Sequence, residues 1–324
     1  MSKKIMRILF LVCLISLTVN SQTLDKDSSR SDKAKTILRL AQEAIYQNAK
    51  MGTIKTIQVK SSGTSVMDST NRIEGESQPR LSSVKQTIDE NILLEFDDKI
   101  SRTTTSFSAN KNPIENFTKI EGVLNGDKFS FKTDLISDGK RIDMNAIFNS
   151  PFMSESMKKQ MKEAQEKAKP TKESFQKSVL TELFPILLNM NWMKDKKFIY
   201  IGKAEAGEKR ADILEIETDT GRQTRYFFDE KTHLLLMITD EISKDEKSSK
   251  TTTYFDDYQL FDGLLVAKKV NREIESSLEN MELEVMGKKR KMSSKSKMVS
   301  ETLIKEFNIN PTFKPDAFTV KESQ

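Results

Sequence analysis

Hydrophobic and polar residues alternate along most of the stretch from residue 211 to residue 274. Leu214 and Ile216, for example, alternate with glutamates. Because successive side chains of a strand point to opposite faces, this period predicts strands with one buried face. The apolar segments are separated only by short turns such as Asp262-Gly263, and connections this short require antiparallel neighbours. The stretch therefore predicts five consecutive antiparallel strands.

The same two-residue period recurs on both sides of this stretch. Asn125-Gly126 is the strongest hairpin signal in the chain, whereas residues 61–83 are polar and fit either a long hairpin or a loop. A sheet of about ten strands must curl or close, which predicts an α+β half-barrel with one concave face. The further predicted strands are Ile54–Val59, Ile88–Phe96, Arg102–Phe107, Ile120–Leu124, Lys128–Leu135, Asp195–Ala206 and Met298–Phe307.

An N-terminal helix is predicted from about Asp32 to Asn48. Apolar residues such as Ala34, Ile37 and Ala41 recur there at spacings of three and four, which places them in one stripe. Such a stripe needs a sheet to cover.

Residues 146–194 form a predicted helical insertion. A highly charged helix should end before Pro170, and a second helix follows, which Pro185 should kink or divide. The segment from Leu180 to Met193 is apolar around its whole circumference, so both of its sides need cover. We expect the insertion to form a lid on the concave face of the sheet.

Several motifs carry a family resemblance. Tyr226–Asp229 reads YFFD, Phe255–Tyr258 reads FDDY, Phe261–Leu264 reads FDGL, and Asp316–Phe318 near the C-terminus reads DAF. In this order they resemble the LolA/LolB-like periplasmic outer-membrane lipoprotein carriers, in an uncharacterised branch. The chain lacks the proline that often follows the Asp-Gly turn in that group. The resemblance implies a half-barrel whose C-terminal Asp-Phe segment docks against the sheet, and a lipoprotein-sorting role.

The N-terminus has the pattern of a secretory signal. Three basic residues precede the apolar run 8–17, and a cleavage site is expected before Gln22. This predicts a signal peptide over 1–21, a flexible tether over 22–32 and a single half-barrel domain over 33–324. Cys13 would leave with the signal, and lipidation there is not expected. The protein should be periplasmic, or alternatively secreted.

Charge and residue types exclude several function classes. The net charge of +5 falls to about +2 when the three basic residues of the signal leave, which is weak for nucleic-acid binding. His233 is the only histidine, and it is expected at the start of an exposed strand. With no cysteine left, the usual zinc and Ser-His-Asp sites cannot be assembled. We therefore expect no catalytic residues, no metal and no cofactor.

The remaining candidates are apolar residues of the insertion, which form either core or the walls of an acyl-chain pocket. They are Phe148, Phe152, Met153, Leu183, Phe184, Leu187, Met190 and Trp192. A basic segment is a second candidate, either as a solvated turn or as a contact for anionic lipid headgroups. It consists of Lys288, Lys289, Arg290 and Lys291.

Three functions compete. The first is a non-catalytic carrier or sensor that shields a lipid, or the acyl chains of a lipoprotein, between sheet and helices. The second is an envelope structural or interaction protein with a filled core and a protein partner. The third, a hydrolase that uses carboxylates distant in sequence, has no specific motif in its favour.

Overall fold

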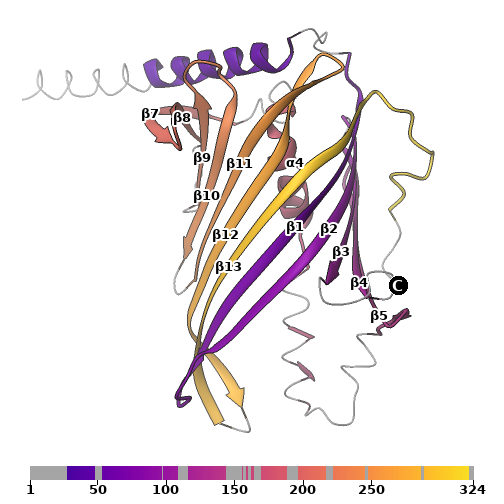
Figure 1. Cartoon of the computed structure of the whole chain (residues 1–324), viewed down its shortest axis with the longest axis vertical. Coiled ribbons are helices and arrows are strands. Elements are labelled where there is room, and N and C mark those ends of the chain that lie inside the picture. Colours follow the sequence, from indigo (N-terminus) through magenta and orange to yellow (C-terminus); the bar gives the residue numbers. More distant parts are fainter. Residues whose placement is uncertain are drawn as a thin grey trace, which may run out of the picture.

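The structure is a computed structural model. It describes residues 28–47, 53–96, 98–108, 116–143, 155, 158–159, 162–163, 169–187, 196–216, 222–244, 247–285 and 288–320. One antiparallel sheet of 13 strands dominates the described residues, together with a helix over residues 28–45 and the helix α4 (Lys172–Leu187) (Figure 1). No helix among these residues is long and apolar enough to cross a membrane.

The strands fall into two series. The first comprises β1 (Thr56–Ile73), β2 (Arg80–Glu95), β3 (Lys99–Ser108), β4 (Phe117–Asn125), β5 (Lys128–Ser137) and β6 (Lys140–Arg141). The second comprises β7 (Phe198–Ala206), β8 (Lys209–Ile216), β9 (Arg222–Asp229), β10 (Leu235–Lys244), β11 (Lys247–Phe261), β12 (Leu264–Val285) and β13 (Lys288–Ile309).

The first six strands run in order from the centre of the sheet to one edge. The next seven run from the opposite edge back to the centre. The strand order is β6-β5-β4-β3-β2-β1-β13-β12-β11-β10-β9-β8-β7. The first and last strands are therefore neighbours at the centre, paired from Ile57 opposite Ile309 to Ile73 opposite Met292. The one long connection joins the edge strands β6 and β7, and α4 lies within it. An edge-to-edge connection has to pass a face of the sheet, which explains why the predicted insertion lies there.

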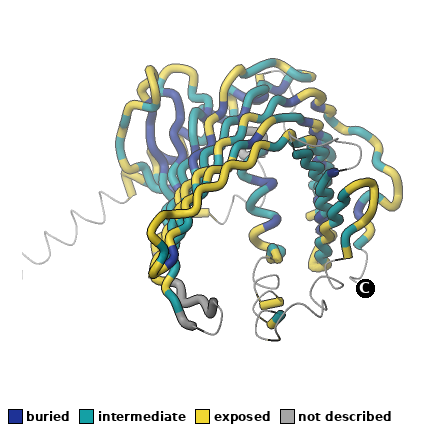
Figure 2. Tube along the Cα trace, turned by 60° about the horizontal axis from the view of Figure 1, so that its bottom comes forward, coloured by how far each residue is buried: buried dark blue, intermediate teal, exposed yellow. Residues whose placement is uncertain are grey.

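A sheet this wide curls, and Figure 2 shows it arching around α4. Apolar residues of the concave face and of both helices form one core. The apolar stripe of the N-terminal helix is buried, including Ala34, Ala41 and Ile45. Lys33 of this helix lies over the ring of Tyr200 on β7, 3.7 Å from its centroid. The predicted curved half-barrel, with an N-terminal helix and a helix on its concave face, is confirmed.

The five strands predicted within residues 211–274 are present as β8 to β12. The total is 13 rather than about ten, partly because the polar stretch 61–83 forms the long hairpin of β1 and β2. Strand β13 also begins at Lys288, where a basic turn was expected. Polar side chains on both faces hide the two-residue period there, while backbone hydrogen bonds still pair the strands. The N-terminal helix includes residues 28–32, which the sequence assigned to the tether.

The C-terminal segment docks against the sheet, as the family resemblance implied. Phe318 is buried, and its carbonyl accepts a hydrogen bond from Asn125 Nδ2 at 3.2 Å.

Candidate functional site

Helix α4 is packed into the concave face by one apolar side. Phe175, Val179, Leu180 and Leu183 are all buried in the main core. The Phe175 ring lies against Gly122 of β4, where any larger residue would collide with it. Glycine at this position therefore lets the helix approach the sheet closely.

Four charged side chains meet beneath α4, and we call them the ion cluster: Glu90, Arg102, Glu182 and Arg272. Glu182 of α4 accepts hydrogen bonds from Arg102 of β3 at 3.1 Å and from Arg272 of β12 at 2.7 Å. Arg102 also donates to Glu90 of β2 at 2.5 Å. All four side chains are largely buried, with exposed fractions between 9% and 22%. Because these charges compensate one another, they fix α4 to strands on both sides of the central pair β1 and β13.

The two carboxyls of the ion cluster differ in acidity. Burial raises the pKa of Glu90 to about 7, the Glu182 charge adds to the rise, and Arg102 opposes it. Although burial alone would raise it, Arg102 and Arg272 lower the pKa of Glu182 to about 2. Near neutral pH, Glu182 therefore carries the negative charge while Glu90 can exchange a proton.

A second set of charged side chains holds α4 to strands β9 and β10. Lys177 Nζ lies 3.3 Å from the carboxylate of Asp240 on β10. Asp240 also accepts hydrogen bonds from Arg222 and Thr224 of β9. Together with the ion cluster, this pair connects α4 to strands on both sides of the half-barrel.

The space beside α4 is nearly filled. A cavity of about 50 Å³ lies between Glu182, Leu183 and the strands, with Ser61 and Thr302 among its walls. A space of this size holds about one or two water molecules and no acyl chain. At Leu183, the described part of the structure therefore shows core rather than pocket.

Beyond α4, the concave face carries an apolar row across four strands. Ile274 of β12 pairs with Met298 of β13, which pairs with Met67 of β1, which pairs with Val84 of β2. Directly paired residues share a face, and Met67 lies an even number of residues from Ser61, which lines the cavity under α4. Met67 and Val84 are each 43% exposed, so the row is accessible from the concave side.

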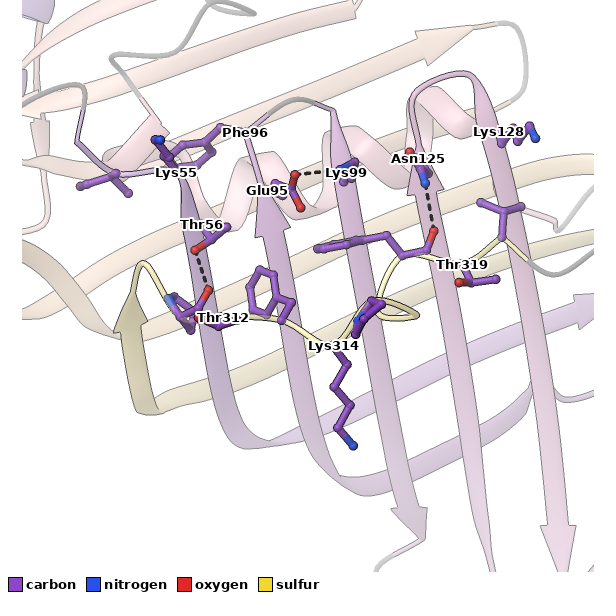
Figure 3. Close-up of a pocket in the computed structure, with 16 residues that line it drawn as sticks. Lys55, Thr56, Glu95, Phe96, Lys99, Asn125, Lys128, Thr312, Lys314 and Thr319 are labelled. Atoms are coloured by element: carbon purple, nitrogen blue, oxygen red, sulfur yellow. Dashed lines mark hydrogen bonds and ion pairs between the residues drawn. The ribbon is translucent and has the colours of Figure 1, made fainter.

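A pocket of about 920 Å³ lies on the other face of the sheet, away from α4, at the end where β1 begins and β2 ends (Figure 3). It is formed between the C-terminal tail, residues 310–320, and the ends of β1 to β5. Its walls include three phenylalanines and four lysines, and Glu95 is the only acidic residue among them. This pocket combines aromatic side chains in its wall with a positively charged rim.

The structure describes only some of the predicted site residues. Leu183 is buried at 2% exposure, and the backbone of α4 includes Phe184 and Leu187, whose side chains lie outside the described part. The other five predicted residues fall outside the described residues: Phe148, Phe152, Met153, Met190 and Trp192.

The basic segment begins β13, where its backbone pairs with an acidic part of β12. Lys291 is opposite Glu282 and Lys289 is opposite Glu284.

Sequence reasoning missed the ion cluster, although the alternation carried a signal for it. Arg102 is two residues from Ile100, Glu90 is two residues from Ile92, and both isoleucines are buried. A charged residue in step with buried apolar neighbours indicates a buried ionic partner elsewhere in the chain.

His233 lies in the turn before β10 with φ of 59°, and its backbone N–H donates to the Asp229 carbonyl at 2.9 Å. Among the described residues, no group of three His, Cys, Asp or Glu side chains is placed to hold a metal ion.

No protein-family model matches the chain, and no curated protein matches it. Among solved structures, it is similar to a DUF1329 family protein from Desulfovibrio piger, with 11% identity and a TM-score of 0.38. It is also similar to a putative outer membrane lipoprotein-sorting protein domain from Vibrio parahaemolyticus, with 12% identity and a TM-score of 0.37. A LolA superfamily protein from Nitrosomonas europaea follows, with 8% identity and a TM-score of 0.33.

Each of these similarities covers 88% of this chain and 97% of the other.

Proposed function

We propose that this protein is an exported, non-catalytic carrier or sensor that holds an acyl chain of a lipid or lipoprotein against its concave face. The apolar row Ile274–Met298–Met67–Val84 is the observation that carries the proposal. Four strands spaced about 4.8 Å apart give the row a span of about 14 Å, which suits an extended chain lying across the strands. Exposed apolar surface on a curved face favours an apolar ligand, because water solvates it poorly.

The position of the proposed site differs from the pocket expected under the lid. At Leu183 the interior is filled, so the ligand would lie beyond α4, and α4 would serve as a fixed wall. The predicted apolar residues of the insertion other than Leu183 stay in the proposal as further contacts for the acyl chain.

The signal-peptide pattern and the family resemblance support a periplasmic location, with residues 1–21 removed and 33–324 forming one domain. The basic segment Lys288–Lys291 is kept as a secondary contact for a membrane surface or an envelope partner.

The test compares two substitutions on opposite faces of the same strand pair. Met67 and Val299 are 43% and 42% exposed, and Val299 follows Met298, so its side chain points to the convex face. Met67→Asp should abolish uptake of a fluorescent fatty-acid analogue, whereas Val299→Asp should leave uptake unchanged. Uptake would be read by fluorescence titration, and native mass spectrometry of protein purified from its own compartment would look for bound lipid.

The alternative, an envelope interaction protein with a filled core, makes the opposite forecast. If the wild-type protein neither co-purifies with lipid nor takes up the analogue, the carrier proposal fails. Equal loss of uptake in both variants would also reject the concave site.

A further inference from the structure

The pocket under the C-terminal tail is held open by specific hydrogen bonds. Asn310 Oδ1 accepts a hydrogen bond from the Lys55 backbone N–H at 2.7 Å, and its Nδ2 donates to the Thr53 carbonyl at 3.0 Å. Thr56 Oγ1 donates to the Pro311 carbonyl at 2.9 Å. With the Asn125 bond to Phe318 at the other end, the tail is fixed at two points and spans the strands between them (Figure 3).

The pocket between these two points has an aromatic lining. The rings of Phe313 and Phe318 meet edge to face with centroids 5.5 Å apart, and Phe96 lines the pocket from the end of β2. Aromatic side chains on a concave surface provide contact area for an apolar group.

The charge around the pocket is unbalanced. Lys99 lies 2.7 Å from Glu95, the only acidic residue in the lining, and so neutralises it. No carboxylate of the described residues lies within ion-pair distance of Lys55 or Lys128. Asp127, the neighbour of Lys128, pairs with Lys172 of α4 at 2.9 Å. In Figure 3, Lys55 and Lys128 stand at opposite ends of the pocket, and Lys314 extends from the tail.

We propose that the tail pocket is a second binding site, separate from the concave face, for an anionic amphiphile. The ligand would place its carboxylate or phosphate at a rim lysine and its apolar body against Phe96, Phe313 and Phe318. Because aromatic rings form part of the wall, a simple anion should bind weakly, and because the rim is net positive, a neutral amphiphile should also bind weakly. The pocket volume of about 920 Å³ lies within the range of small-molecule sites.

The test measures the binding of three probes to the full mature chain by isothermal titration calorimetry. Decanoate has both an anionic head and an apolar body, inorganic phosphate has only the charge, and decyl maltoside has only the apolar chain. Both amphiphiles stay below their micelle concentrations. Decanoate should bind saturably and more tightly than either other probe, and added salt should weaken its binding.

Variants assign the binding to this pocket. Replacing both rim lysines, in K55Q/K128Q, should raise the dissociation constant for decanoate about fivefold or more, as expected for partly exposed charge pairs. K85Q/K295Q removes two exposed lysines of β2 and β13, away from the pocket, and should leave the dissociation constant for decanoate unchanged. Phe313→Ser should weaken decanoate binding without affecting phosphate.

Met67→Asp separates this site from the concave one. Decanoate binding that survives Met67→Asp but falls in K55Q/K128Q supports the tail pocket even if the carrier proposal fails. Binding that depends on Met67 and not on the lysines overturns it, as does equal binding of phosphate or decyl maltoside, or no binding at all.

Discussion

The carboxylate of Glu182 on α4 accepts a hydrogen bond from Arg272 of β12 at 2.7 Å, across 90 residues of sequence. The same carboxylate accepts one from Arg102 of β3, so a single helical residue joins strands on both sides of the central pair. These two hydrogen bonds hold α4 in place against the concave face of the sheet. They also make the stability of the fold depend on charges inside the concave face.

Glu182→Gln should lower the free energy of unfolding by about 2–4 kcal/mol, because both arginines lose a buried negative charge. Urea denaturation followed by circular dichroism would measure the change. Glu173→Gln in the exposed first turn of the same helix is the control and should have a much smaller effect, because it removes only solvent-exposed interactions at the helix N-terminus. Equal stability of Glu182→Gln and wild type would show that the ion cluster does not hold the helix.

The raised pKa of Glu90 predicts a pH dependence. Because its folded pKa of about 7 exceeds the ordinary value of 4.5, the folded state binds the proton more tightly than the unfolded state. Stability from this group is therefore full below about pH 4.5, decreases as pH rises towards 7, and is lost above it. The loss should be on the order of 3 kcal/mol.

Glu90→Gln should remove this slope, since the amide cannot lose a proton. Unfolding free energies of variant and wild type, measured between pH 4.5 and 8, should diverge as pH rises, with the variant more stable at pH 8. Parallel curves would contradict the assignment to Glu90. Glu182, whose pKa is lowered to about 2, adds a slope of the opposite sign only near and below its ordinary value of 4.5, and this contribution is the same in both proteins.

Gly122→Ala should destabilise the protein by about 1–3 kcal/mol, because the added methyl group collides with the Phe175 ring. A smaller partner relieves the collision. Gly122→Ala combined with Phe175→Leu should therefore cost less than the sum of the two single changes, and thermal unfolding of all four proteins would measure the difference. Simple additivity would mean that the two residues do not touch.

Leu183→Trp distinguishes a filled interior from a ligand pocket beside α4. The cavity there, about 50 Å³, cannot take an indole ring, so the variant should lose about 1–3 kcal/mol of stability. Met67→Trp, on the accessible part of the same face, should be tolerated. A Leu183→Trp protein with an unchanged melting temperature would show that the interior can accept the indole ring. It would then support the predicted acyl-chain pocket under the helical insertion.

The two-residue period was enough to predict the strands β8 to β12, although β8 and β9 bury residues on both faces, where Ala211, Ile213 and Phe227 form a second small core. The period of three to four residues likewise predicted the N-terminal helix through Ala34, Ile37 and Ala41. Asn125-Gly126 predicted the hairpin of β4 and β5 for a local reason, since Gly126 adopts φ of 59°. These features depend on neighbours in sequence, so the sequence alone determined them.

The tertiary structure decided which distant residues meet. Glu90, Arg102, Glu182 and Arg272 come from four different elements, and only the sheet order and the edge-to-edge connection bring them together. The tail pocket likewise exists only because the last strand pairs with the first, which carries residues 310–320 across the ends of β1 to β5. Local alternation states which face a residue occupies, but it holds no information about what lies opposite that face.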